Sequence, residues 1–161
     1  GIVITPHIKE MSRLTGLTIN YILANPIEVA SEFSNKYNVI TVLTCAVTVI
    51  AITHGEIFIN TTGDSSLAKG GTGDVLSGII TGFIAQGLKS YDACKLSTYI
   101  HGMAGQLSAK VFSSYGVLAS DVIDFIPKAI IKLLEVNEWK KFMFEYLEFN
   151  PKLYNPLKRY T

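Results

Sequence analysis

The sequence predicts an α/β fold, a layered β-sheet domain with packed helices. Short β-branched runs of strand length lie within the first 60 residues, and apolar repeats of helical period occupy the stretch from 74 to 134. The chain has 161 residues, of which 48% are apolar and 17% are charged, and this composition is typical of one globular domain. Strands followed by helices along one chain favour stacked layers of the two.

One buried strand and then helices are predicted for the first part of the chain. Residues 2–5 have the apolar content of a short strand, which Pro6 ends because proline cannot donate to a β-ladder. Residues 9–14 and 21–37 then suit helices. Pro26 marks the true start of the second helix, since proline is favoured in a first helical turn.

Three further β-branched runs predict the rest of the sheet. They cover residues 39–43, 48–52 and 57–59, and the turn at 53–56 makes the last two a hairpin. Residues 61–73 are rich in Gly, Ser and Thr and predict a long loop. Long ordered loops often carry function, so we expect the functional site here.

Three helices are predicted for the second half of the chain. Apolar side chains recur with a helical period over residues 74–86, 92–111 and 119–134. Gly78 and Gly82 lie one turn apart in the first of these helices. We expect these two glycines to let that helix approach its neighbour closely.

The chain beyond residue 135 has a different pattern. Five apolar residues there share one helical face, and we expect this face to pack against the body of the protein or against a neighbouring subunit. The sequence therefore predicts a domain at 1–135 and a helical extension at 136–161. The five residues are Trp139, Phe142, Met143, Tyr146 and Leu147.

Charge and cysteine content exclude several classes of function. The formal net charge of +1 gives no field that favours a nucleic acid or a membrane surface. Cys45 and Cys94 lack the spacing of a zinc site or a disulfide framework, so we expect a reducing, cytoplasmic setting. The chain opens at Gly1 without a methionine and directly in an apolar run, which reads as a piece of something longer.

A glycine-rich turn in front of a helix is the segment that points to chemistry. In Gly71-Thr72-Gly73 the backbone can turn so that amide groups converge, and the helix start adds unpaired N–H groups and partial positive charge. Such a turn binds anions, commonly phosphate. Asp74 would repel a phosphate unless it acts as a general base for a nearby hydroxyl. The alternative is an ordinary helix start with an aspartate in its first turn.

Six segments together resemble one family, and they occur in that family's order and spacing. The chain resembles the NAD(P)H-hydrate dehydratases over approximately residues 2–134. These enzymes are ribokinase-like, so the resemblance implies a three-layer αβα sandwich of which this chain is the C-terminal half. The six segments are Thr5–Met11, Val47–Ala51, Asn60–Gly63, Gly70–Gly78, His101–Gly102 and Tyr115–Asp121.

The resemblance implies a repair reaction on a damaged cofactor. The family phosphorylates the added hydroxyl of hydrated NADH or NADPH from ADP or ATP, and loss of phosphate restores the nicotinamide ring. Asp74 would take the proton of that hydroxyl, and His7 with Asp74 would contact the hydrated dinucleotide. Mg²⁺ would accompany the phosphates, and a tetramer is the expected assembly. The nucleotide would be bound by Thr44, Cys45, Ala46, Val47, Thr48, Asn60, Gly71, Thr72 and Gly73.

Three positions depart from the family pattern. Thr44 and Cys45 stand where the family has Lys-Gly, so a lysine that pairs with nucleotide phosphates is missing, and Asp64 replaces an asparagine. Lys69 is the residue that would compensate for this lysine. Because the family also has a first half that supplies part of the substrate pocket, we expect no turnover of hydrate by the isolated chain.

Two other functions stay open on the sequence. One is a ribokinase-like kinase for a hydroxymethylpyrimidine, a pyridoxal-like compound or a sugar alcohol, and the other is a truncated relative without catalysis. Among the remaining candidate residues, His54 is expected in a solvated turn and His101 as a packing residue on a helix. Cys94 carries no functional signal.

Overall fold

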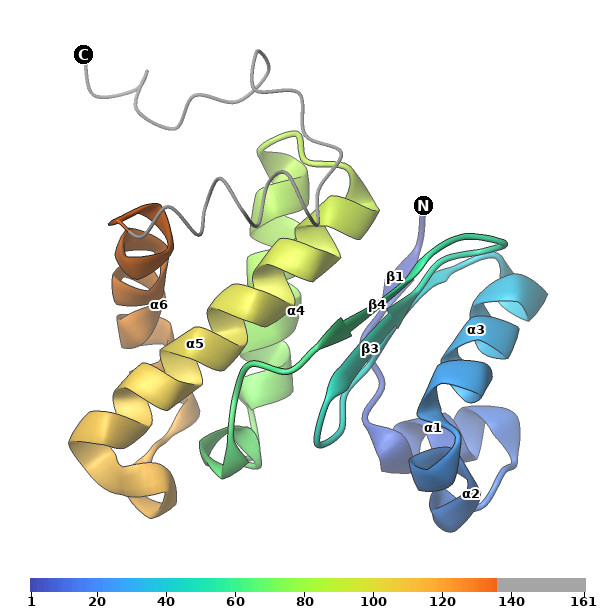
Figure 1. Ribbon diagram of the computed structural model, residues 1–161, viewed down its shortest axis with the longest axis horizontal. Helices are drawn as coiled ribbons and strands as arrows, with labels where there is room; N and C mark the ends of the chain where they lie inside the picture. The colour runs from blue at the N-terminus through green and yellow to red at the C-terminus, as the bar shows by residue number, and fades with distance from the viewer. Residues whose placement is uncertain (136–161) are drawn as a thin grey trace.

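A mixed β-sheet between two groups of helices forms the protein (Figure 1). The structure is a computed structural model, and it describes residues 1–135. The strands are β1 (Val3–Ile4), β2 (Ile40–Leu43), β3 (Thr48–Ala51) and β4 (Ile57–Asn60). The helices are α1 (Ile8–Thr15), α2 (Ile19–Ala24), α3 (Pro26–Tyr37), the 3₁₀ turn η1 (Ser65–Leu67), α4 (Thr72–Ala85), α5 (Ser90–Gly116) and α6 (Ala119–Glu135).

The four strands lie in the order in which they occur along the chain. β1 pairs parallel to β2, with Val3 opposite Ile40, and a parallel bridge between His7 and Thr44 extends this pairing beyond the strands. β2, β3 and β4 then pair antiparallel, so β3 and β4 form the predicted hairpin. The ends of β1, β2 and β4 and the start of β3 therefore meet at one edge of the sheet.

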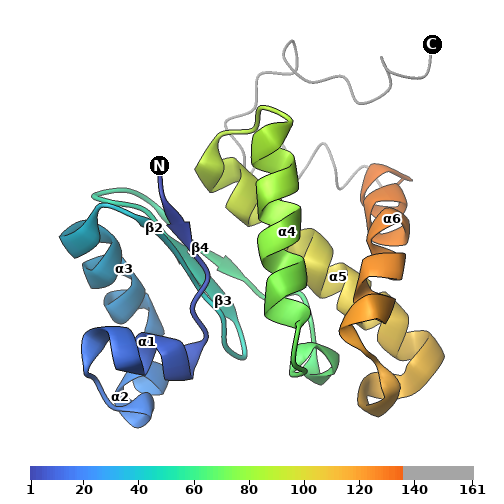
Figure 2. The same cartoon turned by 180° about the vertical axis from the view of Figure 1, so that it is seen from behind.

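Each face of the sheet has its own apolar core. Helices α1, α2 and α3 cover one face and α4, α5 and α6 lie on the other, as Figures 1 and 2 show from opposite sides. Side chains alternate between the two faces along each strand, so Leu43 and Val49 pack toward α1 to α3 while Val42 and Ile50 pack toward α4 and α5. A further core joins α5 to α6. The predicted α/β layering is confirmed.

The first helices follow the predicted boundaries closely. The single helix expected over 21–37 is two helices, and the second begins at Pro26, as predicted. Its start is favourable because proline needs no hydrogen-bond partner for a missing N–H.

α5 is longer than expected, since helical structure extends from Ser90 to Gly116 with one non-helical residue at Ser113. The extension predicted at 136–161 lies outside the described residues.

The prediction for Gly78 and Gly82 is wrong. A Cβ atom added at either residue would meet nothing within 4 Å among the described atoms, so no helix packs closely there. The close approach occurs instead at Gly102 on α5, where an added Cβ would lie 2.6 Å from the carbonyl carbon of Thr62. The long loop after β4 therefore packs directly against the backbone of α5. Sequence spacing alone could not distinguish the glycine pair on α4, which no described element approaches closely, from the buried glycine on α5.

Candidate active site

A cleft of about 1350 Å³ opens at the edge of the sheet where the strand ends meet. Its walls come from the loops after β1, β2 and β4 and from the start of α4. Because the loops that follow neighbouring strands converge at one edge of an α/β sheet, this edge is the usual place for a ligand. Of the predicted site residues, the following line the cleft: His7, Thr44, Cys45, Ala46, Thr48, Asn60, Gly71, Thr72, Gly73 and Asp74.

The glycine-rich turn at the start of α4 has unpaired amide groups. Gly71 precedes the helix with φ of 89°, a left-handed conformation that glycine adopts without strain. Within residues 1–135, the amides of Gly71, Gly73 and Asp74 donate no hydrogen bond to the protein, and that of Thr72 reaches the Lys69 carbonyl only at 3.4 Å. Donors of this kind at a helix N-terminus favour an anion.

Asp74 is exposed on the wall of the cleft, in the first turn of α4. Its carboxylate makes no hydrogen bond or ion pair with residues 1–135, so it is available to a ligand. One turn later, the Ser77 hydroxyl donates to the Gly73 carbonyl at 3.0 Å and lies 3.1 Å from the Thr5 hydroxyl. This contact ties the start of α4 to the end of β1. Asp74 and the glycine-rich turn therefore line the same cleft, and the catalytic role predicted for Asp74 stays a prediction.

Hydrogen bonds from Thr72 and Lys69 brace the turn from behind. The Thr72 hydroxyl contacts the carbonyls of Leu67 and Lys69 at 2.7 and 2.9 Å. The Lys69 ammonium donates to the Tyr115 carbonyl at 3.0 Å, near the C-terminal end of α5. A Cβ on Gly71 would lie 3.2 Å from that of Ala119. Lys69, which was expected to compensate for the missing lysine, therefore links the turn to α5 through a hydrogen bond, and it also lines the cleft.

His7 caps a helix, a role that its sequence position did not reveal. Its Nδ1 accepts hydrogen bonds from the amides of Lys9 and Glu10, each at 3.1 Å. The Glu10 carboxylate in turn accepts from the His7 amide at 2.9 Å, which completes a capping box at the start of α1. Because Nδ1 accepts, the ring hydrogen is on Nε2, 3.4 Å from Glu10. The ring lines the cleft, so the predicted substrate contact stays a prediction.

Two of the predicted nucleotide-binding residues, Thr44 and Asn60, form hydrogen bonds within the protein. Thr44 fixes the loop after β2 because its amide donates to the Pro6 carbonyl at 3.0 Å. Asn60 is buried, and its side chain bonds the Thr98 carbonyl on α5 and the backbone and hydroxyl of Thr62. The side-chain amide of Asn60 therefore holds the loop after β4 against α5. Val47 is not part of the cleft lining.

His101 is the lining residue that sequence reasoning undervalued. It lies on α5 with 8% of its surface exposed, and its Nε2 makes no well-formed hydrogen bond within residues 1–135. Burial lowers the pKa of its ring to about 4, and a hydrogen bond with the backbone of Thr72 opposes that shift. His101 and Gly102 form one of the segments that resemble the family, but a position about three turns into α5 gave no signal for this contact.

Comparison with known proteins decides the family. The family model of the NAD(P)H-hydrate dehydratases matches residues 1–128. The chain belongs to the NAD(P)H-hydrate dehydratase family. The match includes the glycine-rich turn and all the loops that form the cleft, and it confirms the resemblance found in the sequence.

Two relatives show how much of a dehydratase-family protein this chain represents. It is 40% identical over 134 residues to the bifunctional NAD(P)H-hydrate repair enzyme of Moorella thermoacetica, covering 83% of this chain and 25% of that protein. It is 33% identical over 141 residues to the ADP-dependent (S)-NAD(P)H-hydrate dehydratase of Bacillus subtilis, covering 88% and 48%. The chain thus spans from about a quarter to about half the length of these relatives.

Solved structures confirm the ribokinase-like fold of this family member. The dehydratase from Bacillus subtilis, co-crystallised with ATP and Mg²⁺, superposes with a TM-score of 0.78 at 33% identity, over 81% of this chain and 47% of that one. A ribokinase-like superfamily protein from Enterococcus faecalis superposes with a TM-score of 0.69 at 34% identity, over 81% and 44%. The predicted α/β sandwich, matched over part of its length, is therefore confirmed.

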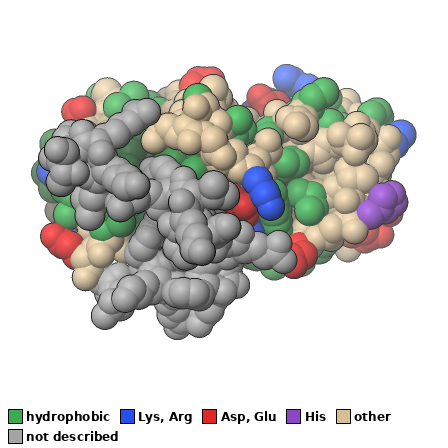
Figure 3. Space-filling view, turned by 90° about the horizontal axis from the view of Figure 1, so that it is seen from above, with side chains coloured by type: hydrophobic (Ala, Val, Ile, Leu, Met, Phe, Trp, Pro, Cys, Tyr) green, Lys and Arg blue, Asp and Glu red, His purple; other side chains and the backbone are tan. Residues whose placement is uncertain are grey.

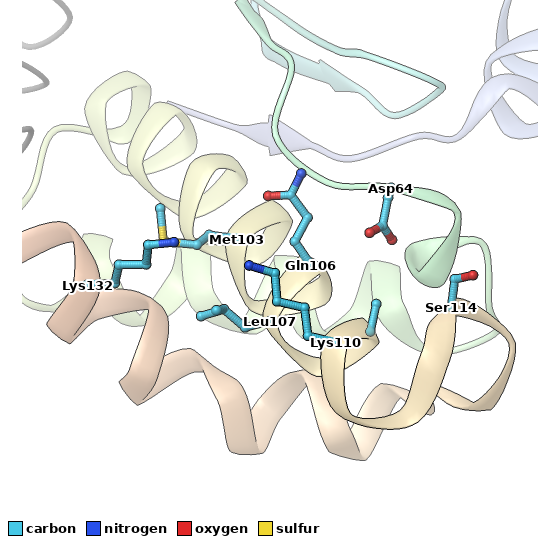
Figure 4. A pocket seen from close by; sticks show the side chains of 8 residues that line it. Asp64, Met103, Gln106, Leu107, Lys110, Ser114 and Lys132 are labelled. Carbon is cyan, nitrogen blue, oxygen red and sulfur yellow. The ribbon is translucent and has the colours of Figure 1, made fainter.

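A smaller hollow lies elsewhere on the described part of this dehydratase-family chain. A hollow of about 500 Å³ lies between α5, α6 and the loop of Asp64, with Lys110 and Lys132 on its sides (Figure 4). Acidic and basic side chains are interspersed on the described part of the face in Figure 3. No group of three potential metal-ligating side chains occurs within residues 1–135, and no helix there can span a membrane.

Proposed function

We propose that the protein containing this chain is an ADP- or ATP-dependent NAD(P)H-hydrate dehydratase. The observation that carries the proposal is the position of the Asp74 carboxylate beside the unpaired amides of Gly71 and Gly73, in one cleft. A base for a hydroxyl and donors for a phosphate are the two functions that phosphorylation of a hydrate requires. Family membership and the ADP-dependent relative support the choice of reaction.

The site residues divide the reaction between them. The hydroxyl oxygen of the hydrated nicotinamide ring attacks the terminal phosphorus of ADP or ATP, its proton passes to Asp74, and AMP or ADP leaves. The amides of Gly71 and Gly73 stabilise the negative charge on the transferred phosphoryl group. The C–O bond to phosphate then breaks as the neighbouring carbon loses a proton, which restores the double bond of NADH or NADPH. General base action contributes roughly 10²–10⁴ in rate.

Mg²⁺ fits this site as a companion of the nucleotide. The cleft offers the carboxylates of Glu10, Asp64 and Asp74, which are not grouped as a metal cage within the described residues. Magnesium is commonly held by one or two carboxylates together with substrate phosphates and water. Asp64 and Asp74 are the carboxylates nearest to the glycine turn in sequence, and the ion would neutralise phosphate charge there.

An assay of the full-length protein tests the proposal. We expect hydrated NADH to be converted to NADH with ADP or ATP, and Asp74→Asn to lower kcat by at least about 10². Activity of Asp74→Asn within about tenfold of the wild type would show that Asp74 is not the base. The 161-residue chain is expected to turn over no hydrate alone, since it spans less than half of the Bacillus subtilis relative.

A relative without catalysis is the second candidate, and one observation favours it. No lysine stands at Thr44 or Cys45, and the Lys69 ammonium is engaged by the Tyr115 carbonyl. The cleft therefore holds less positive charge for nucleotide phosphates than the family pattern provides. Calorimetric titration of the chain with ADP separates the two candidates, because only the dehydratase requires ADP or ATP to bind.

We further propose a cytoplasmic location and a tetrameric assembly for the full-length protein. Both cysteines are free, which suits a reducing compartment, and adenine and nicotinamide nucleotides are available there. The assembly follows from family resemblance alone. The mass of the full-length particle in solution, measured by light scattering, tests it, and a monomer would contradict it.

A further inference from the structure

His101 lines the same cleft as the glycine-rich turn, and its ring interacts with the backbone of Thr72. It is on α5, its side chain is more than nine-tenths buried, and it contributes to the floor of the cleft. Its Nε2 is sealed from solvent and makes no well-formed hydrogen bond within residues 1–135. A buried, unpaired polar atom costs stability, so its presence at this place requires a physical reason.

The backbone of Thr72 is the polar group that acts on the ring of His101. This interaction favours the protonated ring, so the interacting group is an acceptor, and the acceptor on a peptide backbone is the carbonyl oxygen. A carbonyl has two lone pairs and can accept from the imidazole as well as from its own helix. Thr72 lies between Gly71 and Gly73, which line the cleft and whose amides donate no hydrogen bond within residues 1–135.

The ring of His101 is held in this position by contacts on both sides along α5. The Asn60 side chain donates to the Thr98 carbonyl at 3.2 Å, and the Thr62 hydroxyl donates to the Tyr99 carbonyl at 3.2 Å. Next to the ring, Gly102 allows the backbone of Thr62 to pack against the helix. These contacts fix α5 to the loop after β4 and so hold the backbone that carries His101 in place.

We propose that His101 is a positioning residue of the anion-binding turn: its Nε2–H donates to the Thr72 carbonyl when an anion is bound and so directs the flanking amides into the cleft. The proposal rests on the proposed function, whose phosphate site it deepens. His101 does not touch the ligand in this arrangement. A buried neutral imidazole suits the task, because it orients the backbone without placing a second positive charge behind a helix N-terminus.

Two substitutions at His101 test the proposal in the 161-residue chain. His101→Phe keeps the ring shape and removes both nitrogens, while His101→Gln keeps an amide N–H near the position of Nε2. We expect His101→Phe to weaken binding of ADP and of inorganic pyrophosphate about fivefold to tenfold, and His101→Gln to stay within about twofold of the wild type. The affinities are measured by calorimetric titration at pH 7.

A purely structural histidine predicts the opposite pattern. Replacing an unpaired buried polar group by an apolar one of the same shape is neutral or stabilising, so His101→Phe should then melt no lower and bind ADP unchanged. Equal affinity in all three proteins overturns the proposal, and so does an equal loss in both variants. If the wild type binds neither ADP nor pyrophosphate, both the proposed function and the proposal for His101 fail.

A second measurement uses the wild type and does not depend on a folded variant. With ¹⁵N-labelled histidine, the Nε2 resonance of His101 is followed by NMR as ADP is added. We expect it to shift on saturation, because the hydrogen bond to Thr72 becomes well formed. A resonance that stays unchanged at saturating ADP overturns the proposal.

Discussion

The Lys69 ammonium donates a hydrogen bond to the Tyr115 carbonyl across 46 positions of sequence, at 3.0 Å. The bond joins the loop before α4 to the C-terminal end of α5. On the same side, Gly71 lies against Ala119 at the start of α6. The glycine-rich turn is therefore supported by two elements that follow it in sequence, and its geometry depends on the second half of the chain as well as on its own residues.

Lys69 is expected to act through its hydrogen bond more than through its charge. Lys69→Gln keeps a donor for the Tyr115 carbonyl and loses the charge, whereas Lys69→Met loses both. We expect ADP affinity to fall about threefold to tenfold in Lys69→Met and to change little in Lys69→Gln, since one hydrogen bond is lost only in the former. Calorimetric titration measures both. Equal losses in the two variants would show instead that the charge binds phosphate.

Gly71 should tolerate no side chain. Its φ of 89° is left-handed, and a Cβ would lie 3.2 Å from that of Ala119, so Gly71→Ala is expected to lower the free energy of unfolding by about 1–2 kcal/mol. Gly70→Ala is the matched control, because an added Cβ there meets nothing within 4 Å. Urea denaturation of the chain measures both. A stability loss at Gly70 as large as at Gly71 would contradict this account.

Gly102 and Gly78 form a second pair of glycines with opposite expectations. A Cβ at Gly102 would lie 2.7 Å from the Thr62 carbonyl oxygen, so Gly102→Ala must displace the loop after β4 and is expected to cost about 1–3 kcal/mol. Gly78 is exposed in the middle of α4 and has open space around it. Gly78→Ala is therefore expected to stabilise the chain by about 0.5–1 kcal/mol through helix propensity. Thermal unfolding of both variants provides the comparison.

Local patterns predicted the elements well, because each depends on short-range physics. The β-branched runs gave the strands, and Pro26 gave the start of α3. The glycine-rich turn was also recognisable, since its residue types determine its backbone and its free amides. Its supports at Tyr115 and His101 were not, because they depend on which residues the tertiary fold brings behind the turn.

The roles of side chains at the site also divide into those set by local sequence and those set by the tertiary fold. Asp74 lines the cleft because helix geometry places the third residue of α4 beside the turn. Asn60 was expected to contact a nucleotide, yet its amide bonds α5 and Thr62, which no sequence spacing indicates. His7 forms a capping box with Glu10, which the sequence did not indicate because histidine is not among the residues usually found at a helix N-cap.

His7 should contribute to stability through its cap and to function through its ring. His7→Asn retains a side chain that caps a helix, whereas His7→Ala loses the cap and is expected to cost about 1 kcal/mol in the free energy of unfolding. If the ring also contacts the hydrated dinucleotide, both variants raise KM for hydrate in the full-length enzyme. An unchanged KM in His7→Asn would confine His7 to its structural role.

The buried ring of His101 should make the stability of the chain depend on pH below neutrality. The folded pKa of about 4 lies below the ordinary histidine pKa of 6.5, so the unfolded state binds more protons between these values, and the free energy of unfolding rises with pH across that window. From pH 7 to pH 5 this contributes a loss of at most about 2 kcal/mol. His101→Phe removes the titrating group and is expected to show a correspondingly smaller loss. Urea denaturation of both proteins at pH 5 and pH 7 isolates the effect, because all other titrating groups are common to both. Equal losses in the two proteins would show that the imidazole is protonated in the folded chain as readily as in the unfolded one.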